Sequence, residues 1–195
     1  MRGRKRNLNM ARDAQGVSRE HERRQRLDYE ARLARRALDL IGDGVGAAHA
    51  EDKLAGSSLG RLLLRGQADR RDPGGISQRQ YNTGQRWSHI VYRHAALMGY
   101  RLQLRTPSFD MVGGGESCAA PPDDAQIAEV RNDFRLCYDA VMEVCRLHTL
   151  RAREATYGVC ILNWPLSQLR RKDFGLIRLT LNAIGKALGK EERGR

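Results

Sequence analysis

Aromatic residues, β-branched residues and long apolar runs are scarce in this chain of 195 residues. Aromatics make up 6% of the sequence, whereas Leu and Ala dominate the apolar 41%. This composition favours helices over sheets, because strands prefer β-branched and aromatic side chains. No segment approaches the roughly 18 apolar residues of a membrane-spanning helix, and the charged N-terminus lacks the apolar run of a signal peptide. The sequence therefore predicts an all-α, cytoplasmic protein with no membrane partner.

Cysteine is also scarce, and its positions are Cys118, Cys137, Cys145 and Cys160. In a cytoplasmic protein these thiols are expected to be reduced. Cys145 and His148 are three residues apart, with Cys137 and Cys160 in range, but this spacing matches no common zinc pattern. Cys137 and Cys145 also fall on the apolar face of an expected helix, where thiols act as small hydrophobes. We expect no metal and no cofactor, although the sequence leaves open whether these four side chains ever bind a metal.

Signatures of enzymes are missing as well. The sequence contains no G-x-S-x-G, P-loop, H-E-x-x-H or Rossmann fingerprint. Its adjacent acidic pairs, Glu51-Asp52 and Asp123-Asp124, would point in different directions on a helix and are typical of caps and solvated faces. The sequence therefore predicts no catalytic residues and a protein that is not an enzyme.

Positive charge is what the chain has in excess. It carries 35 Lys and Arg against 23 Asp and Glu, a formal net charge of +12 at pH 7. Both ends are basic, whereas residues 111–149 hold more acidic than basic side chains. Basic segments are attracted to phosphate, and Arg suits bidentate contacts with phosphate or guanine. A GC-rich codon usage explains Arg in place of Lys but not the excess of positive charge, so DNA is the expected partner.

Glycine and proline divide the chain into four parts. Residues 1–18 are predicted to be a disordered basic arm that lies on nucleic acid, with a solvated tail of no specific role as the alternative. Residues 19–104 predict a helical domain, and residues 123–195 predict a second, helix–turn–helix-like helical domain. Between them, residues 105–122 contain three consecutive glycines and predict a flexible linker. The candidate nucleic-acid contacts in the arm are Arg4, Lys5 and Arg6.

Apolar residues at helical spacing predict the individual helices. Ser77 and Gln80 have the spacing of a capping box at the start of one of them, and Gly158 is expected to end another. The first helix is indicated by the apolar residues Leu27, Ala31, Ala34, Leu38 and Ile41. The expected helices cover residues 19–41, about 48–55 with an extension to 64 that Gly56 bends or divides, 78–98, 123–147, 150–157 and, as one helix or a helix pair, 166–188.

Two basic groups are the candidate nucleic-acid contacts. Arg79, Arg86 and Arg93 recur every seven residues, which places them in one row along a helix. Such a row suits a phosphate backbone, and an ordinary solvated face is the alternative. The other group lies around a Trp-Pro pair in a helix–turn–helix-like layout, whose second helix would enter the major groove through its N-terminal residues. Its members are Arg151, Arg153, Ser167, Gln168, Arg170, Arg171, Lys172 and Arg178.

Two stretches resemble a family of alphaproteobacterial regulators. Residues 76–87, ISQRQYNTGQRW, resemble the segment LS-x-x-Q-Y-x-A-G-x-R of a domain found in prophage regulators and in activators of gene transfer agents of the GafA and GafY type. A later family segment with V-C, E-R and W-P ahead of an apolar helix resembles this chain as well. The resemblance covers about residues 76–100 and 137–189. Its second part rests on Val144-Cys145, Leu150, Glu154, Trp164-Pro165, Leu179, Leu181, Ala183, Ile184 and Leu188.

The resemblance implies a phage-type transcription regulator that binds DNA and contacts RNA polymerase. The chain departs from the family in a longer spacing between Glu154 and Trp164. The leading hypothesis is a late-gene activator or antiterminator. One alternative is a small-terminase-like DNA-packaging protein or another oligomeric DNA-binding phage protein. Another is a protein that binds polymerase and barely touches DNA.

Overall fold

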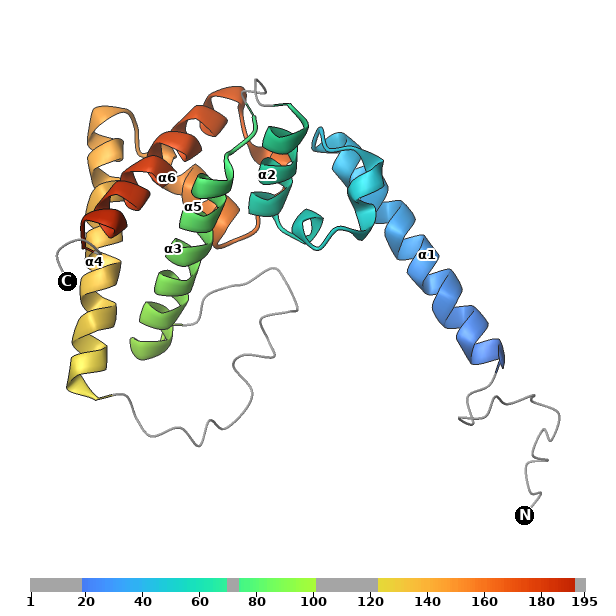
Figure 1. Ribbon diagram of the computed structural model, residues 1–195, viewed down its shortest axis with the longest axis horizontal. Coiled ribbons are helices and arrows are strands. Elements are labelled where there is room, and N and C mark those ends of the chain that lie inside the picture. Colours follow the sequence, from blue (N-terminus) through green and yellow to red (C-terminus); the bar gives the residue numbers. More distant parts are fainter. Residues whose placement is uncertain (1–18, 70–73, 101–122, 192–195) are drawn as a thin grey trace, which may run out of the picture.

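The structure is a computed structural model that describes residues 19–69, 74–100 and 123–191 (Figure 1). The described residues form α-helices joined by short 3-10 helices, and they contain no strand. This confirms the all-α class that the composition predicts. None of the described helices is long and apolar enough to cross a membrane. The basic arm at residues 1–18, with Arg4, Lys5 and Arg6, and the expected linker at 105–122 lie outside the described residues.

The helices follow one another in a simple order along the chain. The α-helices are α1 (Arg19–Gly42), α2 (Ser58–Ala68), α3 (Gln78–Leu97), α4 (Asp124–Leu147), α5 (Arg151–Cys160) and α6 (Arg171–Glu191). The 3-10 helices are η1 (Ala47–Glu51), η2 (Leu54–Gly56) and η4 (Leu166–Gln168).

Local signals set the starts of three helices. The predicted capping box is confirmed at α3, where the Ser77 side chain accepts from the backbone of Gln80 and the Ser77 N–H donates to Gln80 Oε1 at 2.9 Å. Asp123 caps α4, because its Oδ1 accepts from Gln126 N at 2.7 Å. Ser57 caps α2 in the same manner, because its Oγ accepts from the backbone nitrogen of Gly60, the third residue of the helix, at 3.0 Å.

The segment around Gly56 is divided there, one of the two outcomes expected, but its first part is not α-helical. Residues 47–56 form two 3-10 turns, η1 and η2, and the α-helix begins only after them. Gly60 explains the tight join, since a Cβ there would lie 2.0 Å from the carbonyl oxygen of Leu54. The close approach of η2 to α2 therefore depends on a residue without a side chain.

Two adjoining cores hold α2 to α6 together. The first lies among α3, α4, α5 and α6, and the second joins α2 to α5 and α6. The first contains Trp87, Ile90, Val91, Cys137, Val141, Val144, Cys145, Ala152, Ile161, Ile184 and Leu188. The second contains Leu59, Leu62, Leu63, Ile76, Ala155, Val159, Leu166, Leu169, Ile177 and Leu181.

These shared cores differ from the expected division into domains at 19–104 and 123–195. Trp87 and Ile90 of α3 bury their side chains against Ile184 of α6, across the segment 101–122. Figure 1 shows α3 lying beside α4 and beneath α6. The described helices on the two sides of that segment thus share hydrophobic cores.

α1 lies at the edge of the molecule and projects away from the helical body (Figure 1). Only its C-terminal half packs, through a small third cluster that includes Leu40, Val45 and Leu64. The buried carboxylate of Asp43, just after α1, pairs with Arg61 of α2. Residues 20–32 of α1 are all exposed to solvent.

Candidate nucleic-acid interface

The connection between α5 and α6 carries part of the predicted basic group around Trp164-Pro165. This connection begins two residues later than the sequence suggests. α5 was expected to end at Gly158, but it continues to Cys160. Gly158 has a packing role instead, because a Cβ at this position would lie 2.4 Å from the ring of Trp164. The glycine lets the indole lie flat against the helix, so the prediction of a helix stop there was wrong.

The turn after α5 is pinned to α2. Asn163 adopts a left-handed conformation with φ of 51°, which Asn tolerates better than most residues. Its Oδ1 accepts from the backbone nitrogen of Ser58 at 2.6 Å and from the Ser58 hydroxyl at 2.9 Å. The backbone nitrogen of Trp164 donates to the carbonyl of Gly158 at 2.8 Å, which closes the turn onto α5. The path toward α6 therefore has fixed partners on two helices.

This connection is longer than that of a standard helix–turn–helix. Residues 161–170 separate α5 from α6, whereas the turn of that motif has about three to four residues. Pro165 precedes the single 3-10 turn η4, and α6 begins only after it. Leu166 at the start of that turn and Leu169 just after it are buried. These two side chains anchor the chain on both sides of the exposed Ser167 and Gln168.

Asp173, in the first turn of α6, organises the start of this helix. Its side chain is only 2% exposed and accepts from the Arg170 backbone N–H at 3.0 Å and from Arg151 Nη2 at 2.8 Å. Burial by itself raises the pKa of this carboxyl, but the hydrogen bonds from Arg151 and Arg170 outweigh it and hold the pKa below its usual value. The carboxylate thus caps α6 and ties it to α5.

Arg151 is a packing residue and not a free cation. Besides Asp173 it pairs with Glu154 at 3.3 Å, and its guanidinium lies 5.8 Å from the centroid of the Trp164 ring. The hydrogen bond to Asp173 raises the pKa of Arg151. Arg151 was expected to support DNA contacts. In the structure its guanidinium is paired within the protein, because the buried carboxylate of Asp173 needs a partner of opposite charge.

The residues around the start of α6 form the exposed part of the predicted group. We call Ser167, Gln168, Arg170, Arg171 and Lys172 the α6-start cluster. All five are exposed, and in the part of the chain that the structure describes the three cationic side chains make no ion pair. They surround the positive end of a 21-residue helix, which adds its own attraction for anions. The arrangement has the chemistry of a phosphate-binding surface.

The second predicted group lies elsewhere. Arg79, Arg86 and Arg93 are exposed along α3. The start of α3 meets the middle of α6, where Gln80 Nε2 donates to the carbonyl of Arg178 at 3.5 Å. Arg178 is half-buried there, about two turns beyond Arg171. The row on α3 therefore begins away from the α6-start cluster.

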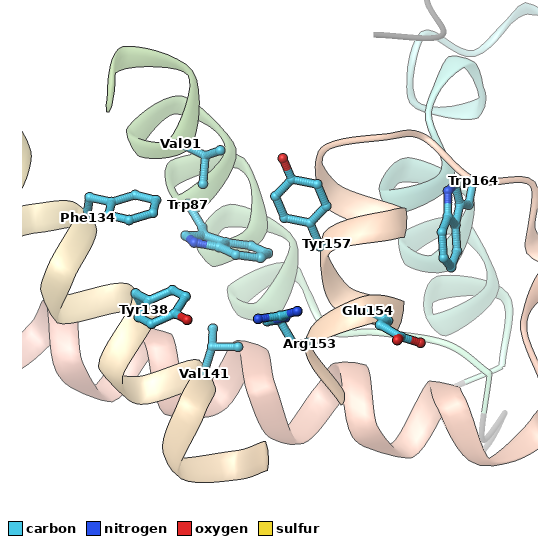
Figure 2. Close-up of a pocket in the computed structure, with 9 residues that line it drawn as sticks. All are labelled: Trp87, Val91, Phe134, Tyr138, Val141, Arg153, Glu154, Tyr157 and Trp164. Atoms are coloured by element: carbon cyan, nitrogen blue, oxygen red, sulfur yellow. The ribbon is translucent and has the colours of Figure 1, made fainter. Parts of the chain in front are cut away.

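Arg153 faces a pocket that sequence reasoning missed. The pocket has a volume of ≈ 340 Å³ and lies among α3, α4 and α5, with Trp87 and Tyr157 meeting edge-on at 6.2 Å between ring centroids. Figure 2 shows the aromatic side chains of the three helices around it. It is lined by Trp87, Val91, Phe134, Tyr138, Val141, Arg153, Glu154, Tyr157 and Trp164. The sequence places these aromatics on separate helix faces and has no signal that they converge.

The candidate metal ligands are dispersed. Cys137 and Cys145 are buried in the first core, burial raises the pKa of the Cys160 thiol to about 12, and His148 is exposed at the end of α4. Among the described residues, no three His, Cys, Asp or Glu side chains gather closely enough to hold an ion. Cys118 lies outside them.

No protein-family model, curated protein or solved structure matches this chain. The resemblance to regulators of the GafA and GafY type therefore stays a prediction from the sequence.

Proposed function

We propose that this protein is a DNA-binding transcription regulator of phage-type genes, a late-gene activator or antiterminator that acts with RNA polymerase. The α6-start cluster is the observation that carries the proposal. Arg170, Arg171 and Lys172 present three cations together on a chain whose net charge is +12. Such a surface attracts the DNA backbone and releases its counterions on binding.

The cluster also has the order that recognition requires. Buried residues hold it from both sides, with Leu169 9% exposed and Asp173 2% exposed. A backbone held in place gives the cations a defined register on the phosphates, while Ser167 and Gln168 supply neutral side chains that can hydrogen-bond base edges. Phosphate contacts would provide the affinity, and these two residues would provide the choice of sequence.

The polymerase and phage-gene parts of the proposal rest on the resemblance at residues 76–100 and 137–189. Apart from Phe134, the residues that line the aromatic pocket lie within these segments, and Arg153 and Glu154 are among them. It supplies an apolar surface with polar neighbours, which suits a protein partner better than DNA. Polymerase binding at this face is consistent with DNA binding at the α6-start cluster.

Charge reversal tests the DNA face. We expect Arg170→Glu, Arg171→Glu and Lys172→Glu together to weaken DNA binding and to lower the salt slope by about two to three, since each phosphate contact contributes about 0.9. The matched control carries Arg131→Glu, Arg135→Glu and Arg146→Glu, the same change of charge at exposed positions of α4 outside both predicted groups. Equal losses in both variants, or an unchanged affinity in the first, would show that the α6-start cluster is not the DNA face.

Selection from a genomic DNA library then tests the regulatory role. Enrichment of a shared motif is the result expected of a site-specific regulator. Salt-sensitive binding without enrichment, combined with co-purification of RNA polymerase, would indicate a factor that takes its specificity from polymerase. A large closed ring in solution would favour the alternative, a DNA-packaging protein.

A further inference from the structure

α1 carries an apolar stripe that the rest of the described protein does not cover. The exposed fractions of Leu27, Leu38 and Ile41 are 55%, 70% and 59%, and Ala31 and Ala34 between them are exposed as well. The stripe that predicts this helix from the sequence is therefore not the face that packs. The packed face consists instead of Leu33, Ala37 and Leu40.

The spacing of the exposed stripe is that of a coiled coil. Its five residues are separated by four, three, four and three positions, which is the heptad pattern of a and d positions. Ala31 and Leu38 then occupy a positions, and Leu27, Ala34 and Ile41 occupy d positions. A helix that only packs on its own domain has no need of a second seam at this period.

We propose that α1 pairs with α1 of a second copy of this chain in a parallel, in-register, two-stranded coiled coil. The pairing would bury the stripe of each copy against the same stripe of the other, with two-fold symmetry. The small side chains of Ala31 and Ala34 let the two helices approach closely at the middle of the seam. The inference is independent of the proposed DNA binding.

Charges beside the seam favour the parallel arrangement. In a parallel coil a g residue of one helix faces the following e residue of its partner. Arg23 (g) then faces Asp28 (e) of the other copy, and Glu30 (g) faces Arg35 (e), so each of these contacts joins opposite charges. An antiparallel coil matches e with e and g with g, which leaves Glu30 opposite the uncharged Ala37.

These charges are available for a partner. Within the described residues, Arg23, Asp28 and Arg35 form no ion pair. Glu30 pairs with Arg26 of its own helix at 3.1 Å, but both side chains are more than half exposed, and such pairs contribute little. Glu30 can therefore shift toward Arg35 of a second copy at small cost.

The attachment of α1 leaves the seam accessible. The helix is held from its other side by Leu40 and by the Arg61–Asp43 pair beyond its end, and its first half projects clear of the body (Figure 1). At the other end of the seam, Leu38 borders a cavity of ≈ 400 Å³ between α1 and the turn that includes Asn163.

Leu38→Glu in the full chain tests the seam. The wild-type protein is expected to sediment, over a concentration series, with twice the 22.0 kDa mass of one chain. The variant is expected to raise the dimer dissociation constant about tenfold or more, since it places a charge in the apolar seam. Leu38 is 70% exposed in the single chain, so the substitution removes no packing contact within one copy. Arg32→Glu, exposed on the same helix but off the seam, is the control and should remain dimeric.

The outcomes separate cleanly. A monomeric wild type at every concentration would overturn the proposal, as would a trimer, a tetramer or a dimer that Leu38→Glu does not weaken. The readout is mass, so loss of DNA binding with an intact dimer would count against the proposed function alone.

A charge swap tests the direction of the helices. Glu30→Arg would face Arg35 of the other copy in the parallel dimer and weaken it, and adding Arg35→Glu should restore the pairing. In an antiparallel dimer the first change would be harmless. The double variant would then weaken binding, because Glu at position 35 would face Asp28. That pattern would overturn the parallel arrangement.

Discussion

At the scale of single residues, Asp173 connects the fold to the candidate interface. It accepts from a backbone N–H of its own helix start and from an arginine 22 positions earlier. A buried carboxylate is stable only when hydrogen bonds or an ion pair offset the loss of water. Here Arg151 supplies the ion pair, and the hydrogen bond from the Arg170 N–H holds the backbone at that residue. The buried carboxylate of Asp173 thus helps to fix the backbone that carries the exposed cations of the α6-start cluster.

Asp173→Asn is expected to lower the free energy of unfolding by about 2 kcal/mol, since it replaces the charge-assisted hydrogen bonds of the carboxylate by weaker neutral ones. Because the folded-state pKa of Asp173 is depressed, its contribution is present above the unfolded pKa and is lost as the pH falls through the folded pKa. The difference between wild type and variant in denaturant unfolding should therefore shrink toward low pH. Glu154→Gln, at the exposed partner of Arg151, is the control with little effect; a pH-independent difference would contradict the assignment.

At the scale of elements, α3 begins by local rules and then serves a distant contact. Ser77 and Gln80 close the capping box, and the same Gln80 side chain reaches Asn182 of α6 at 3.1 Å. Gln80 therefore helps to start α3. It also links the first turn of α3 to α6. The direction of the Arg79, Arg86 and Arg93 row follows from how α3 lies against α6.

Ser77→Ala should cost about 1 kcal/mol of stability, because the backbone N–H that Ser77 accepts from would lose its partner. Thermal unfolding followed by circular dichroism measures the effect. Ser167→Ala is the matched control, since Ser167 is exposed and caps no helix, and its midpoint should stay unchanged. Equal midpoints for wild type and Ser77→Ala would mean that the capping box contributes nothing.

At the scale of the molecule, helices from both sides of residues 101–122 depend on each other. Ile184 and Cys137 are fully buried in a core to which α3 contributes Trp87. A fragment that keeps α4 to α6 without α3 would expose these side chains to water. Burial of such residues is the main favourable term in folding.

We expect the full chain to unfold in one cooperative step as seen by helicity and by Trp fluorescence, since Trp87 lies in the first core and Trp164 packs against the second. A fragment of residues 123–195 is expected to lack a cooperative transition. Its near-ultraviolet circular dichroism would show whether side chains pack. A fragment with native-like unfolding would restore the two-domain organisation that the linker composition predicts.

The sequence by itself determined the features that depend on neighbouring residues. The all-α class, the capping box at Ser77 and the helical periods along α1 and α4 follow from hydrogen bonds and spacings within one or two turns, which any reader of the chain can apply. Whether the α6-start cluster binds DNA stays a prediction from both the sequence and the exposed charges.

Only the tertiary structure decided which faces meet. Gly158 lies inside a helix because Trp164 packs on it, Arg151 turns inward because Asp173 is buried, and the heptad stripe of α1 is exposed because Leu33 and Leu40 pack instead. Each of these outcomes depends on contacts between residues of different elements. A local sequence pattern does not show which of the possible contacts forms. Burial is a property of the assembled molecule, so the roles of these side chains appear only once the helices are packed.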